Sequence, residues 1–221
     1  GNGKRTAMVG LPIGIAVVVI HLLRHNRLRL LLAFVSIAVL VGSLVALTPR
    51  IQTQWMEGIQ EVRRALAGEV NPGSWNPRIH MIRITGGMIE DRPLTGWGVG
   101  GWNSQWQERA PEVIRNTNMP HNDFLWMGAE TGLPGALAWT GLMLIGLIAL
   151  WRIRNWAAAA ASGAIAIAFV SSLINNGTRD ATIGLPMLML VGLLYARAFS
   201  SGAPAMAMQD EGTVASTVER P

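Results

Sequence analysis

The sequence contains no cysteine among its 221 residues, and charged side chains make up only 14 % of the chain. The absence of cysteine excludes a disulfide scaffold and thiolate metal sites. Soluble domains carry about 25 % charged residues, so this chain does not have the composition of a water-soluble globule. The same composition excludes disordered, collagen-like and coiled-coil chains. The net charge of +5 points to nucleic acid only if the basic residues cluster, so the positions of the 18 lysines and arginines decide.

What the chain has instead is a set of long apolar runs without charged residues. Each run is about 16 to 19 residues long, and roughly 20 residues are needed to span a bilayer core. Five such runs in a soluble protein would require a polar shell that this sequence lacks. We therefore predict an all-α, multi-pass integral membrane protein with about five transmembrane helices. The runs are 7–23, 30–48, 134–151, 156–174 and 181–196.

Arginines in the short connections set the orientation of these spans. Arg24, Arg27 and Arg29 lie between the first two runs, and Arg152 and Arg154 lie between the third and fourth. Because short cytoplasmic loops carry an excess of basic residues, both connections are predicted to face the cytoplasm. These arginines account for part of the positive charge, so we expect no nucleic-acid partner.

This topology divides the chain into four parts. Residues 1–48 hold two transmembrane helices, 49–133 form a periplasmic loop domain, 134–199 hold three further spans, and 200–221 form a disordered cytoplasmic tail. The long loop carries eight arginines and nine acidic residues, a nearly neutral balance. Since most of the polar chemistry lies there, we expect function to lie there too.

Two helices are predicted in the first half of the loop. The first is amphipathic and is expected to lie on the membrane surface or against the bundle. The second should start with Asn76 as its cap and Pro77 in its first turn, which places Arg78 on the first turn, and should run to Asp91. The apolar face of the first helix consists of Ile51, Trp55, Ile59, Val62 and Leu66.

A glycine-rich stretch and a short helix complete the loop. Trp97 and Trp102 alternate with glycines from 96 to 101, and because no strand precedes them we interpret the stretch as a turn beneath an aromatic membrane anchor. The helix begins at His121 and breaks at Gly132 and Pro134. A histidine on a first helical turn is near the positive helix end, which favours a neutral imidazole able to accept a proton.

The order of the polar motifs resembles the C-terminal half of the O-antigen ligase and polymerase superfamily of bacterial inner membranes. Members have many more spans than five, and the chain opens on Gly1 rather than Met, so we expect a piece of a longer protein. The stretches that carry the resemblance are Asn2-Gly3-Lys4-Arg5-Thr6-Ala7, Asn76-Pro77-Arg78, Asp91-Arg92-Pro93-Leu94-Thr95-Gly96-Trp97-Gly98, His121-Asn122 with Leu125, and Gly132-Leu133-Pro134-Gly135.

The resemblance implies a metal-independent, inverting glycosyltransferase of the multi-pass (GT-C-like) kind, without a cofactor. It implies a glycan donor linked to undecaprenyl pyrophosphate and, in ligases, a lipid A-core acceptor at the periplasmic face of the inner membrane. The functional arginines of the family fall on Arg5 and Arg78 and its functional histidine on His121, with Asn122 beside them in substrate binding. Lys4 departs from the usual pattern, in which a serine is common.

The same residues make chemical sense on their own. The leaving group is a lipid-linked pyrophosphate, and an arginine neutralises its developing charge with two hydrogen bonds at once. Arg5 lies where the first span meets the periplasm, at the depth of such a pyrophosphate, which explains why it breaks the positive-inside rule. His121 is either the general base for the acceptor hydroxyl or a group that orients the pyrophosphate.

Other classes of protein remain open at this point. A polysaccharide polymerase or a protein O-oligosaccharyltransferase would carry overlapping motifs, with a growing glycan or a protein as acceptor. A transporter or flippase subunit should place ionisable residues at mid-membrane, where these spans are nearly bare, and a structural or sensor subunit would not need Arg78 and His121. The loop carboxylates that a metal would need are Glu90, Asp91, Asp123 and Glu130, which lack typical ligand spacing.

Overall fold

The computed structural model describes residues 2–117, 119–179 and 181–200, and the side chains of 2–8, 44 and 50–52 fall outside the description. The expected cytoplasmic tail after Ser200 also lies outside the described residues. The described helices are α1 (Asn2–Leu23), α2 (Arg27–Leu47), α3 (Pro49–Leu66), α4 (Asn76–Asp91), α5 (Gly101–Arg109), the 3-10 helix η1 (Glu112–Ile114), α6 (Asp123–Trp151), α7 (Trp156–Ile174) and α8 (Gly184–Ser200).

The all-α, membrane-spanning fold class is confirmed, since the described residues form helices and contain no strand. Three helices are long and apolar enough to cross a membrane, namely α2, α6 and α7. Two shorter apolar helical segments, Val9–Leu23 and Gly184–Ser200, coincide with the first and fifth predicted spans. The five apolar runs of the sequence are therefore five helices, three of full spanning length.

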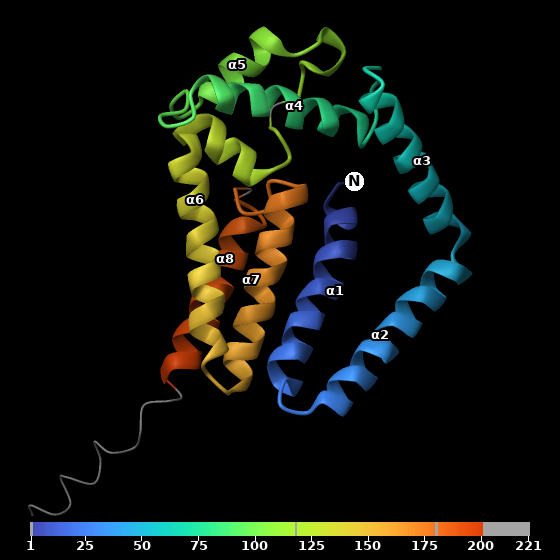
Figure 1. Ribbon diagram of the computed structural model, residues 1–221, viewed down its shortest axis with the longest axis vertical. Helices are drawn as coiled ribbons and strands as arrows, with labels where there is room; N and C mark the ends of the chain where they lie inside the picture. Colours follow the sequence, from blue (N-terminus) through green and yellow to red (C-terminus); the bar gives the residue numbers. More distant parts are fainter. Residues whose placement is uncertain (1, 118, 180, 201–221) are drawn as a thin grey trace, which may run out of the picture.

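Helix α7 is the centre of the bundle. Figure 1 shows α1, α6 and α8 beside it, whereas α2 leans away and α3 leads back from α2 to α4. The contact with α1 is close because glycines face each other: a Cβ added at Gly14 would lie 3.2 Å from the backbone oxygen of Gly163. Small residues at a crossing let the backbones approach, which is how helices associate in a lipid environment.

Asparagine caps begin three of the apolar helices. The side-chain oxygen of Asn26 accepts from Arg29 N at 3.0 Å, that of Asn155 from Ala158 N at 2.8 Å, and that of Asn122 from Leu125 N at 2.9 Å. Each cap satisfies a backbone donor that the helix leaves unpaired. The start of α6 at Asp123 is therefore fixed locally by its own sequence.

The break expected at Gly132 is confirmed as a kink inside α6. Gly132 has φ 72° and ψ −176°, a conformation that side-chain-bearing residues rarely adopt. A Cβ at this position would lie 2.6 Å from the carbonyl carbon of Leu94. The glycine thus lets the loop before α5 pack against α6, and it turns the first part of α6 relative to the membrane span.

A small core outside the bundle joins α4, α5 and the start of α6. Trp102 and Trp106 are fully buried in it and stack with ring centroids 5.1 Å apart. The expectation that the glycine-rich stretch carries an aromatic membrane anchor is wrong for Trp102, whose Nε1–H donates to the buried Thr85 hydroxyl at 2.9 Å. The other buried members of this core are Met81, Met88, Ala110, Ile114 and Ala129.

Helix α4 begins one residue earlier than expected, because Trp75 rather than Asn76 is its cap residue. The capping group comes from α3: Glu61 Oε2 accepts from the backbone N–H of Ser74 at 2.8 Å and of Trp75 at 2.6 Å. The Asn76 side chain instead holds the preceding turn, donating to Glu69 O at 2.9 Å. A carboxylate at a helix N-terminus is stabilised by the unpaired amides and the helix dipole.

Candidate functional site

His121 lies immediately before the cap residue of α6. Figure 1 shows that α6 begins at the end of the bundle where α4 crosses it. The sequence predicts it on the first turn of the helix, but the structure places it one residue before the cap Asn122, with φ 51°. Positive φ in a residue other than glycine is uncommon, and such conformations cluster at functional sites. The side chain is half-buried.

The imidazole of His121 contacts α7 across 54 residues of sequence. Its Nδ1 lies 3.0 Å from Oδ1 of Asn175, the residue that ends α7. Burial lowers the pKa of His121 below its ordinary value, and the positive charge of Arg78 lowers it further, while the hydrogen bond to Asn175 acts in the opposite direction. The net effect favours the neutral imidazole, the form that accepts a proton.

Arg78 reaches the same place from α4. It sits on the first turn of that helix, only 9 % of it is exposed, and its guanidinium carbon lies 5.3 Å from the centre of the Trp75 ring. Its positive charge helps to lower the pKa of His121, so α4 contributes a cation to the surroundings of this histidine. The structure thus brings together Arg78 and His121, which lie 43 positions apart in the chain.

Asn122 lies next to His121, and its side chain is engaged at both ends. Its oxygen caps α6, and its Nδ2–H donates to the backbone oxygen of Leu173 in α7 at 2.9 Å. These bonds fix the start of α6 against the end of α7. The predicted substrate contact of Asn122 stays a prediction.

Arg5 lies in the first turns of α1, and its side chain is outside the described part of the structure. Figure 1 shows the N-terminal end of α1 at the same end of the bundle as α4. The role of Arg5 stays a prediction.

The connection between α7 and α8 folds onto the start of α6 through Asp123. This aspartate is 1 % exposed, and its Oδ2 accepts from the backbone N–H of Thr178 at 3.2 Å and from the Thr178 hydroxyl. The Thr178 hydroxyl also lies 3.2 Å from the hydroxyl of Ser172. Asp123 is thereby an anchor for the connection.

A second carboxylate in this region, Glu130, is also engaged. It is 4 % exposed, its Oε1 accepts from the backbone N–H of Gly100 at 2.9 Å, and its Oε2 lies 3.6 Å from Arg179. The guanidinium of Arg179 stacks 3.6 Å from the centre of the Trp126 ring and is 34 % exposed. Glu130 therefore ties the glycine-rich stretch to α6, and Arg179 adds a second cation to this end of the bundle.

Sequence reasoning missed Asn175 and Arg179, which enter the site from the α7–α8 connection. The sequence shows only that this connection is a polar stretch between two apolar runs. The contact between His121 and Asn175 spans 54 positions, so no local pattern predicts it. Among the residues that the structure describes, no three His, Cys, Asp or Glu side chains gather into a group that could hold a metal ion.

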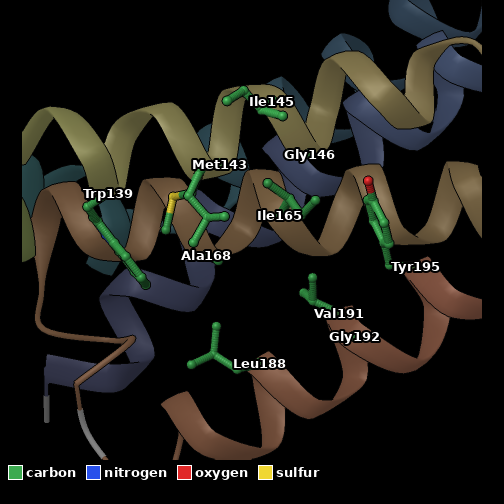
Figure 2. Close-up of a pocket in the computed structure, with 11 residues that line it drawn as sticks. Trp139, Met143, Ile145, Gly146, Ile165, Ala168, Leu188, Val191, Gly192 and Tyr195 are labelled. Carbon is green, nitrogen blue, oxygen red and sulfur yellow. The ribbon is translucent and has the colours of Figure 1, made fainter.

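A separate cavity of about 410 Å³ lies between α6, α7 and α8, as Figure 2 shows. Trp139, Met143 and Ile165 point into it, together with Leu188 and Tyr195 from α8. Its lining contains no carboxylate, lysine, arginine or histidine. This cavity therefore does not include His121 or Arg78.

These features define a helical membrane protein with a cationic, histidine-containing site at one end of its bundle. Residues 1–140 match the family model described as O-antigen ligase, and the chain belongs to this family. The family lies within the O-antigen ligase and polymerase superfamily, whose members are glycosyltransferase-like enzymes of membranes. A comparison with curated protein sequences found no match.

Proposed function

We propose that this protein is an O-antigen ligase-type transferase that moves a glycan from undecaprenyl pyrophosphate to a lipid A-core acceptor, without a metal and with inversion. The observation that carries the proposal is a buried arginine, Arg78, whose positive charge acts on a half-buried histidine, His121, with a pKa lowered mainly by burial. The family supports the reaction class, and these two groups supply the two things that the reaction needs.

The first need is charge neutralisation on the leaving group. As the bond between the anomeric carbon and the pyrophosphate oxygen breaks, negative charge grows on the pyrophosphate. Arg78 is already held in place by α4 before the reaction starts, and such preorganised stabilisation is commonly the largest catalytic contribution. We propose that Arg5 binds the same group from α1, and that Asn122 contributes a contact to the substrate.

The second need is a base for the acceptor. The acceptor hydroxyl attacks the anomeric carbon from the face opposite the pyrophosphate, so that the configuration inverts. Its proton passes to the unprotonated nitrogen of His121, and a new bond between the acceptor oxygen and the anomeric carbon forms as the pyrophosphate leaves. A general base of this kind contributes about 10²- to 10⁴-fold in rate.

The site is proposed to face the periplasm of a bacterial inner membrane. Arg24, Arg27 and Arg29 lie in and beside the α1–α2 connection, and Arg152 and Arg154 lie in the α6–α7 connection. Figure 1 shows both connections at the end of the bundle opposite α4. The positive-inside rule makes that end cytoplasmic, so residues 49–133 are the periplasmic part between spans within 1–48 and 134–199.

The test is transfer by the full-length protein in liposomes containing an undecaprenyl-pyrophosphate glycan. Three acceptors are offered in parallel: rough lipopolysaccharide, the same glycan on its lipid, and an acceptor protein. We expect glycosylated lipopolysaccharide, and we expect His121→Ala to reduce the rate by about 10²-fold or more. Products only with the second or third acceptor would identify a polymerase or a protein-glycosylating enzyme and overturn the ligase assignment.

The role of His121 has its own control. His80 is a buried histidine on α4 whose Nε2 contacts the backbone oxygen of Glu69 at 3.0 Å. His80→Ala therefore serves as the matched loss of a buried imidazole that bonds to the backbone. If His121→Ala were no slower than His80→Ala, the assignment of His121 as the base would be wrong.

A further inference from the structure

The α7–α8 connection lies beyond the residues that the family model matches, yet it contributes to the site. The matched region ends at residue 140, and Asn175 lies 35 positions further on. Asn175 is the residue after the last turn of α7; its backbone is extended, and its own N–H donates to Ser171 O at 2.8 Å. That bond and the anchoring of Thr178 to Asp123 hold the Asn175 side chain against His121.

The contact between Asn175 and His121 determines which imidazole nitrogen carries the proton. A neutral imidazole has one N–H and one nitrogen lone pair. The atom that faces Nδ1 is the amide oxygen Oδ1 of Asn175, at 3.0 Å, and an amide oxygen can only accept. With the amide oxygen in this position, Nδ1 carries the proton and the lone pair of Nε2 is left for a substrate proton.

We propose that Asn175 is a positioning residue that holds His121 as the Nδ1–H tautomer, with Nε2 as the proton acceptor. The role of Nε2 as proton acceptor rests on the proposed function. The position of the proton on Nδ1 does not depend on that function. The position of His121, whose φ is 51°, is held from two sides. Asn122 caps α6 after it, and Asn175 holds the ring from α7.

The charge of the partner matters as much as its geometry. Among the described side chains, Arg78 of α4 acts electrostatically on His121. Asp123 lies two residues after His121, and Arg179 of the connection acts electrostatically on Asp123. A neutral amide opposite Nδ1 orients the ring without stabilising the imidazolium strongly. A carboxylate at the same place would favour the charged ring and raise the pKa of His121.

The first experiment reads the tautomer without measuring activity. The full-length protein is labelled with ¹⁵N-histidine, placed in nanodiscs, and studied by long-range ¹H–¹⁵N correlation, with the His121 signals assigned by their loss in His121→Gln. We expect a protonated Nδ1 and an unprotonated Nε2 in the wild type, and a mixture of tautomers in Asn175→Leu. A wild-type Nε2–H tautomer, or one that Asn175→Leu leaves unchanged, would overturn the proposal.

The second experiment separates positioning from a merely structural role. Asn175→Leu should lower kcat of transfer by about 10- to 100-fold, part of what a general base contributes, with little change in donor KM. Asn175→Asp keeps an oxygen acceptor, so it should retain more activity than Asn175→Leu. Because the carboxylate raises the pKa of His121, the acidic limb of the pH profile should move to higher pH. The exposed Asn103 of α5 provides the control variant Asn103→Leu, which should match the wild type.

The two experiments distinguish the possible failures. If His121→Ala keeps full transfer, the proposed function of His121 fails while the tautomer measurement still tests Asn175. If both Asn175 variants lose activity equally and the pH profile does not move, Asn175 is structural and the positioning role is refuted.

Discussion

Glu61 of α3 caps the start of α4, the helix that carries Arg78, so its substitution tests how α3 positions that arginine. Its Oε2 accepts two short hydrogen bonds, from Ser74 N and Trp75 N, and a third from Asn76 N at 3.4 Å. A hydrogen bond to a charged group contributes about 1.5–3 kcal/mol, and partial exposure of Glu61 reduces that. Glu61→Ala should therefore lower the free energy of unfolding by about 2 kcal/mol.

The loss of Glu61 should also affect activity, because Arg78 lies on the helical turn that Glu61 caps. Loss of the cap should loosen that turn and raise donor KM, measured by transfer in liposomes. Glu57 is an exposed glutamate one turn earlier on α3, so Glu57→Ala is the matched control. If thermal unfolding and donor KM of Glu61→Ala equalled those of Glu57→Ala, the capping argument would be refuted.

Three further predictions follow. Gly132→Ala should destabilise the protein by about 1–3 kcal/mol, because φ 72° strains a residue with a Cβ, whereas Gly141→Ala, with open space around it, should be close to neutral in thermal unfolding. Because burial lowers the pKa of His121, the ring should stay neutral below its ordinary value of about 6.5, and the transfer rate should fall only at more acidic pH; a fall centred above 6.5 would contradict this. Transfer should persist after incubation with EDTA, and a loss restored by a divalent cation would contradict a metal-independent reaction.

The helices were predictable because their signals are local. Apolar runs of spanning length, the Asn and Pro residues near helix starts, and the break at Gly132 are all patterns within a few residues. The amphipathic stretch that became α3 was predicted in the same way, and Trp55 and Ile59 are exposed in the structure as a membrane-facing surface would be. The helix start at α4 was displaced by one residue because a distant carboxylate, Glu61, took the capping role.

The site was only partly predictable because it is assembled from distant segments. Motif spacing drew attention to Arg78 and His121, but nothing local connects either of them with Asn175. The burial of Trp102 was missed for the same reason: an alternation of glycine and tryptophan does not tell a membrane anchor from a core side chain. The positive φ of His121 has no local signature in the sequence, and sequence patterns placed this residue on the first turn of the helix.

Single-turnover transfer by the full-length protein in liposomes tests whether Arg78 stabilises the leaving pyrophosphate. Arg83 lies on the same helix with an exposed side chain, so Arg83→Ala controls for loss of a positive charge from α4. We predict that Arg78→Ala slows the chemical step by about 10²- to 10³-fold while Arg83→Ala transfers at the wild-type rate. Equal rates for the two variants would contradict the proposed role of Arg78.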